Sequence, residues 1–160
     1  MNFRIEKSAE KDVSAIVEMI REFAAFENLS DFCEVTEENL QDAMFGENSC
    51  VEGLMAFTEN KPVGYALFYE NFTSFRGQRG VYLEDLYVKS EFRRLKIGEA
   101  FLKKLAQIAK ERNSKRIDFL VLDWNEPAIR FYKKLDAKMN SEERHFRFVD
   151  EAFEKLSEQV

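Results

Sequence analysis

A chain of 160 residues with 45% hydrophobic and 14% aromatic residues has apolar material for one sizeable core and is short for two, so residues 1–160 are predicted to form a single domain. Its 24 Lys and Arg against 30 Asp and Glu give a net charge of -6. That field repels phosphate backbones and anionic membranes, so neither nucleic acid nor membrane is expected as a partner.

The amino-terminal part predicts one strand and two helices. Residues 3–7 alternate apolar and charged side chains, which is typical of a half-buried strand. Asp12 precedes residues 13–24, whose apolar side chains recur with the helical period, and Thr36 is a candidate cap for a second helix that ends near Gly46. The amino terminus lacks the apolar region of a secretory signal and no apolar run approaches a membrane-spanning length, so the expected location is the cytoplasm.

The rest of the chain predicts strands and helices in alternation. Three segments rich in aromatic and aliphatic residues are predicted as consecutive antiparallel strands, namely residues 51–57, 63–72 and 81–88. After Lys89 the period becomes helical, with apolar residues from Ile97 to Ala109 on one face. A strand over 116–123, a helix from Asn125 to about Leu135 and two short strands within 137–149 follow. This order predicts an α+β fold, with a mixed, largely antiparallel sheet of six to seven strands and helices on both faces.

Three cations stand at the joint between the third of these strands and the next helix. Arg93, Arg94 and Lys96 precede the helix start. Unpaired backbone amides and the dipole at a helix amino terminus attract anions, so these side chains would reinforce a pyrophosphate site. A solvated basic turn is the alternative reading of this cluster alone. Cys33 and Cys50, without C-x-x-C spacing, indicate neither a disulfide framework nor a zinc site.

A motif downstream makes the first reading more specific. Asn-x-x-Ala-x-x-Phe-Tyr, from Asn125 to Tyr132, follows the Arg-x-x-Lys-x-Gly turn and resembles the GNAT superfamily of acetyl-CoA-dependent N-acetyltransferases. The strand Tyr-Leu-Glu-Asp over residues 82–85 and the segment Trp-Asn-Glu-Pro over 124–127 resemble the spermidine/spermine (diamine) and thialysine acetyltransferases within it. The resemblance covers essentially the whole chain and implies acetyl-CoA as co-substrate, no metal, and a homodimer.

The resemblance also implies where the coenzyme binds. The fourth and fifth strands are expected to splay apart, and the pantetheine arm would enter between them. Its expected contacts are the main chain of Leu86, Tyr87 and Val88, the phosphate turn Arg93, Arg94, Lys96, Ile97, Gly98, Glu99 and Ala100, and the thioester-facing residues Asn125, Phe131 and Tyr132.

The chemistry of amine acetylation assigns two further roles. An alkyl ammonium has a pKa of about 10.4, so a base must accept its proton, and Glu84 is the candidate. The departing thiolate needs a proton or a strong hydrogen bond, which the phenol of Tyr132 can supply. The alternatives are that Glu84 is a strand residue at a wet edge and that Tyr132 is a core aromatic whose hydroxyl reaches the surface.

A cationic acceptor requires anionic partners. Glu84, Asp85, Glu27 and Glu143 are the candidate substrate-binding residues, with Glu27 and Glu143 carried over from the resemblance of their neighbourhoods. For these two, a solvated helix glutamate is the alternative. The sequence departs from the family at Lys96, where glycine is usual, at Asp136, another glycine position, and at His145, where some polyamine-acetylating members carry an aromatic contact.

Three functions are therefore weighed. The first is N-acetylation of a small cationic amine such as a diamine, a polyamine or a thialysine-like compound. The second is acetyl transfer to another amine, in an amino acid, an aminoglycoside or a protein. The third is an acetyl-CoA-binding module without catalysis, which Lys96 suggests and which the presence of Glu84 and Tyr132 argues against.

Overall fold

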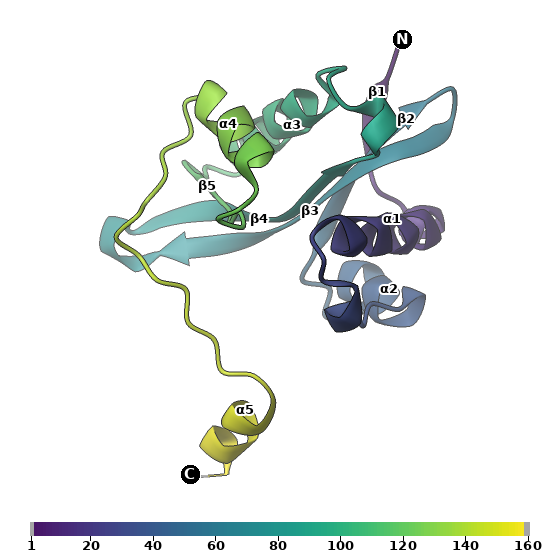
Figure 1. The fold of residues 1–160 in the computed structure, drawn as a ribbon. Helices are drawn as coiled ribbons and strands as arrows, with labels where there is room; N and C mark the ends of the chain where they lie inside the picture. The colour runs from purple at the N-terminus through teal and green to yellow at the C-terminus, as the bar shows by residue number, and fades with distance from the viewer. Residues whose placement is uncertain (1, 159–160) are drawn as a thin grey trace. The chain divides into compact units, whose positions relative to one another are not determined.

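The computed structural model describes residues 2–158 and divides into two compact units, Met1–Leu120 and Val121–Val160, which are described separately (Figure 1). The first unit contains five strands, β1 (Arg4–Lys7), β2 (Glu52–Thr58), β3 (Lys61–Thr73), β4 (Gln78–Val88) and β5 (Ile117–Asp118). Its α-helices are α1 (Val13–Phe26), α2 (Glu37–Phe45) and α3 (Ile97–Glu111). Four 3₁₀ turns join these elements, η1 (Glu10–Asp12), η2 (Ser30–Phe32), η3 (Ser74–Arg76) and η4 (Ser90–Phe92).

The strands form one sheet in the order β1-β2-β3-β4-β5. The first four pair antiparallel, whereas β5 is parallel to β4. The β4–β5 ladder joins only Val81 to Ile117 and Tyr82 to Asp118. The strand expected over 116–123 is therefore confirmed at two residues, and in the described part of the chain β4 has no β5 partner beyond Tyr82.

Helices cover both faces of this sheet, as predicted (Figure 1). On one face α1 and α2 pack on the strands around Ile16, Tyr65 and Tyr87. On the other face α3 packs through Phe101 and Leu105 on a second apolar cluster. Among the helices within residues 2–158, none has both the length and the apolar character that crossing a membrane requires.

Local capping decides where the first helices begin. The hydroxyl of Thr36 accepts a hydrogen bond from the Asn39 amide at 3.1 Å, and the Asn39 side chain accepts one from the Thr36 amide at 3.0 Å. This reciprocal pair satisfies orphan donors at the start of α2. Asp12 precedes α1 as expected, but its carboxylate accepts from the Ala9 amide at 2.9 Å and so closes the preceding 3₁₀ turn instead.

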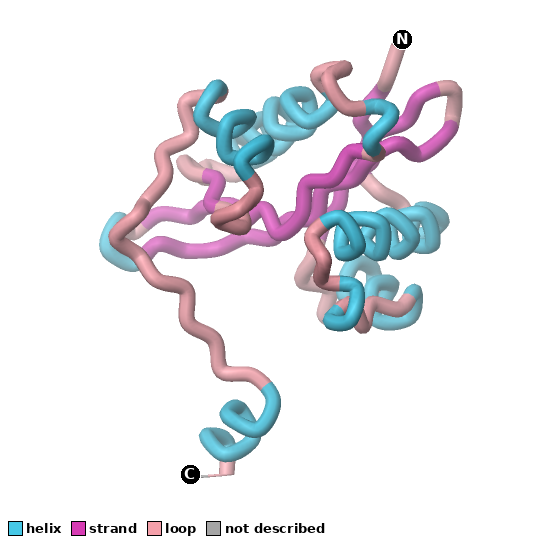
Figure 2. The backbone as a smooth tube through the Cα atoms, viewed as in Figure 1, coloured by secondary structure: helices cyan, strands magenta, loops and turns pink. Residues whose placement is uncertain are grey.

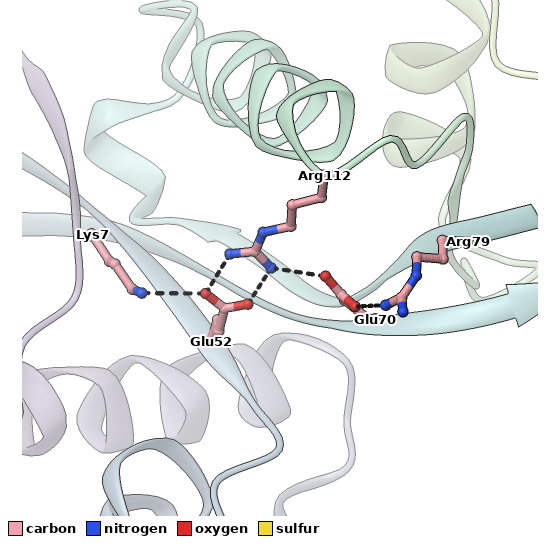
Figure 3. Close-up of polar contacts among 5 residues, drawn as sticks. All are labelled: Lys7, Glu52, Glu70, Arg79 and Arg112. Atoms are coloured by element: carbon pink, nitrogen blue, oxygen red, sulfur yellow. Dashed lines mark hydrogen bonds and ion pairs between the residues drawn. The ribbon is translucent and has the colours of Figure 1, made fainter.

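A network of ion pairs fastens the carboxyl end of α3 to the sheet (Figure 3). Arg112 contacts Glu52 on β2 at 2.8 Å and Glu70 on β3 at 3.5 Å. Lys7 on β1 and Arg79 on β4 extend the network, at 3.3 Å from Glu52 and 2.9 Å from Glu70. The hydrogen bonds from Arg112 hold the pKa of Glu52 below its usual value. Arg112, the residue that follows α3, therefore ties the carboxyl end of this helix to β2 and β3.

The second unit contains α4 (Glu126–Lys134) and α5 (Asp150–Ser157). Within residues 121–158, the stretch from 135 to 149 contains neither helix nor strand (Figure 2). The two strands expected within 137–149 are therefore absent there, and the sheet has five strands in place of six to seven. The side chains of Phe146 and Phe148 alternate as in a strand but are 88% and 65% exposed, because alternation alone supplies no neighbouring ladder.

Candidate active site

Strand β4 contains a bulge at the carboxylate expected to act as base. On β3, Leu67 lies opposite Asp85 and Phe68 lies opposite Leu83, so Glu84 has no partner across the pair. An extra residue of this kind stays unpaired, bends its strand and re-aims its side chain. The Glu84 side chain is exposed, which an acceptor of substrate protons requires.

The bulge also brings two successive carboxylates to one face of the sheet. Leu83 belongs to the apolar cluster under α3, and after the bulge Leu86 packs against the same cluster. With Glu84 as the extra residue, the side chains of Glu84 and Asp85 both belong to the opposite face, which α1 covers. Across the pair, the pKa of Tyr69 is raised by burial and then by the Glu84 charge and a hydrogen bond to its carboxylate.

Asp85 is a half-buried carboxylate that accepts a hydrogen bond from a neutral donor. The hydroxyl of Tyr65 donates to Oδ2 of Asp85 at 3.0 Å. Burial raises the pKa of Asp85 to about 6; the Tyr65 hydrogen bond opposes this rise and the Glu84 charge adds to it. Within residues 2–158, no lysine or arginine forms an ion pair with Asp85.

Glu27 completes what we call the acidic cluster, defined as Glu27, Glu84 and Asp85. It follows the last residue of α1, and its pKa is raised first by burial and then by the charge of Asp85. Across the described residues no three His, Cys, Asp or Glu side chains are grouped closely enough to hold a metal ion. The charge of Asp85 raises the pKa of Glu27 and the charge of Glu84 raises that of Asp85, and a cation such as an alkyl ammonium near them would relieve this repulsion.

The joint before α3 has the backbone geometry of a tight anion-binding turn. Arg94 and Lys96 both adopt left-handed conformations, with φ of 65° and 64°. Lys96 is the residue immediately before α3, and its carbonyl accepts the first helical hydrogen bond from Ala100 at 3.0 Å. The amides of the following first turn have no intrahelical partner and face the helix amino terminus, so the turn suits phosphate oxygens.

The side chain of Arg93 makes contacts that were not expected. Its Nε donates to the carbonyl of Val88 at 3.0 Å, and its guanidinium lies over the ring of Phe26, 4.7 Å from the centroid. Nearby, Glu22 accepts hydrogen bonds from Tyr87 at 3.0 Å and from Lys89 at 2.8 Å. In this structure Arg93 therefore ties the end of α1, which carries Glu27, to the end of β4.

Lys96→Gly is expected to stabilise the protein by roughly 0.5–1 kcal/mol, because a side chain in the left-handed region is strained and glycine is not. At this chain length that corresponds to a rise in Tm of about 1–4 °C. Thermal unfolding measures the change. Lys96→Ala is the matched control, since it removes the charge but keeps the Cβ; a Tm for Lys96→Gly no higher than for Lys96→Ala would contradict the strain.

In the second unit, α4 begins with the cap predicted for it. Oδ1 of Asn125 accepts from the Ala128 amide at 3.3 Å, and Asn125 is buried. The ring of Phe131 meets that of Tyr132 edge-on, with centroids 5.0 Å apart. Burial raises the pKa of Tyr132 to about 12, so its phenol remains a proton donor throughout the working pH range. After α4, Asp136 occupies its expected turn with a φ of 62°.

The remaining candidates stay predictions. Glu143 is exposed in the second unit, within the stretch that has neither helix nor strand, and His145 follows it there. The acidic cluster and the turn before α3 belong to the first unit, whereas Asn125, Phe131 and Tyr132 belong to the second. The structure thus brings together Glu27, Glu84 and Asp85 among the expected substrate-binding residues.

Comparison with known proteins identifies the family of this chain. The family model described as "Acetyltransferase (GNAT) family" matches residues 16–137. The chain belongs to the GNAT acetyltransferase family. It is therefore an acyltransferase enzyme.

The names of relatives of this GNAT enzyme describe acetylation of amines. The chain is 38% identical over 164 residues to a thialysine N-epsilon-acetyltransferase of Sus scrofa, covering 96% of each chain. It is 36% identical over 156 residues to the spermidine/spermine N(1)-acetyltransferase-like protein 1 of Homo sapiens, covering 91% of this chain and 22% of that protein. An integron cassette protein from the mobile metagenome of V. cholerae has a similar structure, with a TM-score of 0.81, 26% identity and 99% of each chain covered.

Sequence reasoning missed two residues of this GNAT site. Tyr65 contacts Asp85, and Glu22 joins Tyr87 to Lys89. A signal for the first exists, because a tyrosine inside a strand of buried apolar residues usually needs a partner for its hydroxyl. No comparable signal marks Glu22 among the other charged residues of α1.

Proposed function

We propose that this chain is an N-acetyltransferase that moves the acetyl group of acetyl-CoA to a primary amine of a small cationic acceptor, of the diamine, polyamine or thialysine class. The observation that carries the proposal is the acidic cluster, in which Asp85 is half-buried near Glu27 and Glu84 and forms no ion pair with a basic side chain of the described residues. A protonated amine supplies the missing positive charge. The printed names of the thialysine and spermidine/spermine relatives support this acceptor class.

The residues available for acetyl-CoA fit its chemistry. The turn with Arg94 and Lys96 in left-handed conformations leads into the amino terminus of α3, where amides and cations suit a diphosphate. Beyond Tyr82 the edge of β4 carries no paired strand among the described residues, which leaves the main chain of Leu86, Tyr87 and Val88 for the pantetheine amides. When bound, the coenzyme supplies an activated acetyl thioester.

The proposed reaction is direct attack by the amine on that thioester. Glu84, directly or through a water, accepts a proton from the ammonium so that the nitrogen lone pair becomes available. A backbone amide near Tyr87 stabilises the negative charge that develops on the carbonyl oxygen. Tyr132 donates a hydrogen bond to the departing sulfur. Asp85, Glu27 and Glu143 hold the charges of the acceptor.

The proposal treats residues 1–160 as one catalytic domain. The family model matches residues 16–137 and so includes the acidic cluster, the turn before α3 and all of α4.

An amine panel tests the proposal through release of free coenzyme A thiol. Diamines, polyamines and thialysine-like acceptors are expected to give kcat/KM at least about tenfold above monoamines of equal length, since a second ammonium gains a charged hydrogen bond. If none of the primary amines in the panel were acetylated, the result would contradict acetylation of amines. A preference for monoamines or peptides would instead contradict the proposed acceptor class.

A further inference from the structure

A fully buried tyrosine supports the acidic cluster from β3. The side chain of Tyr65 is 0% exposed, and its hydroxyl donates to Oδ2 of Asp85 at 3.0 Å. Its ring lies 6.1 Å from that of Tyr87, the residue opposite it on β4. The strand, the neighbouring ring and the helix α1 pack around the phenol of Tyr65. This packing restricts the direction in which its hydroxyl can donate a hydrogen bond.

Asp85 has few other means of staying ionised. The titratable groups that face it are Glu84 on its own strand, Glu27 at the end of α1, and Tyr65 on β3. Tyr65 is in turn close to Tyr87 and Cys33. Burial and the Glu84 charge both favour the protonated acid, and the hydrogen bond that the Tyr65 hydroxyl donates to this carboxylate opposes them.

We propose that Tyr65 is a positioning residue for the acceptor site: its hydroxyl fixes one oxygen of Asp85 and favours the ionised carboxylate that receives the substrate ammonium. This role rests on the proposed amine acetylation. It assigns to Tyr65 no contact with either substrate, because its hydroxyl is already committed to Asp85 in the protein core.

The physical properties of tyrosine suit this task. Burial, followed by the charge of Asp85, raises the pKa of Tyr65 well above its usual value, so the phenol remains a neutral donor at every working pH. A neutral donor favours the carboxylate without neutralising it, whereas a lysine or arginine in this place would compete with the substrate for the same charge. The unbonded oxygen of Asp85 remains for the ammonium.

Carboxyl-carbon NMR of Asp85 across a pH titration tests the first half of this inference without any need for activity. In Tyr65→Phe the pKa of Asp85 is expected to rise by about one unit, because a hydrogen bond to the charged form is lost. Tyr87→Phe is the matched control: it deletes a hydrogen bond of the same 3.0 Å length at the paired position, but one that goes to Glu22. An equal shift in both variants, or none in Tyr65→Phe, would overturn the inference.

The pH dependence of amine kcat/KM tests the second half. The acid limb of Tyr65→Phe is expected to move up by about one pH unit, which lowers kcat/KM about fivefold at pH 6 and less than about twofold at pH 8. In an Asp85→Asn background the same substitution is expected to change kcat/KM less than about twofold, since its target is no longer ionisable.

The outcomes separate the two proposals. Equal losses from Tyr65→Phe with and without Asp85 would mean a general structural role and would overturn the positioning role alone. A wild-type enzyme that acetylates no amine would overturn the proposed function, while the NMR titration would still decide whether Tyr65 controls the ionisation of Asp85.

Discussion

Replacing Tyr132 with phenylalanine is expected to lower kcat about a hundredfold while changing the Kd for acetyl-CoA by less than about threefold. The hydroxyl stabilises charge that appears on sulfur only as the thioester breaks, so its loss affects the transition state more than the bound ground state. Steady-state kinetics at saturating amine, with calorimetric titration of acetyl-CoA, measures both quantities.

The raised pKa of Tyr132 refines how this phenol acts. At about 12 it is well above the value of about 8.5 for a typical thiol, so complete proton transfer to the departing thiolate is uphill. A hydrogen bond to the developing negative charge requires no such transfer and is strengthened in a site without water. We therefore expect no basic limb from Tyr132 in the pH profile below about pH 10.

Two results would contradict this role. A parallel loss of acetyl-CoA affinity and kcat in Tyr132→Phe would make the hydroxyl a positioning group for the coenzyme. An unchanged kcat would remove it from the chemistry altogether. Phenylalanine retains the edge-on ring contact with Phe131, and thermal unfolding of the variant measures any change in stability separately from these two outcomes.

Elements with local signals were predictable from the sequence. Thr36 and Asn125 were identified as caps, and each accepts the amide hydrogen bond that defines its helix start. The helical period of α3 and the strand composition of β2 to β4 likewise depend on neighbouring residues. The prediction of strands within 137–149 was wrong. A strand forms only when a neighbouring strand pairs with it, and the sequence of one segment does not reveal such a neighbour.

The chemistry of the site was predictable residue by residue, but its contacts were not. Glu84 and Asp85 are adjacent in a recognisable motif, whereas the bulge at Glu84 depends on the register with β3. The Tyr65 hydrogen bond crosses strands, and the contact of Arg93 with Phe26 joins β4 to α1. Such pairings arise from tertiary packing, so the sequence indicates which side chains are unusual without indicating which ones meet.

Glu84→Gln is expected to lower amine kcat/KM at pH 7 by about 10²–10³-fold. An alkyl ammonium with a pKa of about 10.4 is less than about 0.1% neutral at this pH. Without the carboxylate to accept the proton, only this neutral fraction of the amine can react. Glu84 is exposed and unpaired in the backbone ladder, and glutamine keeps a side-chain oxygen that can accept the hydrogen bond from Tyr69. The amide is therefore expected to leave Tm within about 1 °C of wild type.

The pH profile distinguishes a base from a simple anionic contact. If Glu84 removes the proton, log kcat/KM of Glu84→Gln rises by about one unit per pH unit from 7 to 10, as neutral amine accumulates, while the wild-type profile is flatter. An acceptor made less basic by a nearby electron-withdrawing group is the control, since more of it is already neutral and the loss should shrink in proportion. A constant loss at every pH and for every acceptor would assign Glu84 to binding and leave proton removal to solvent.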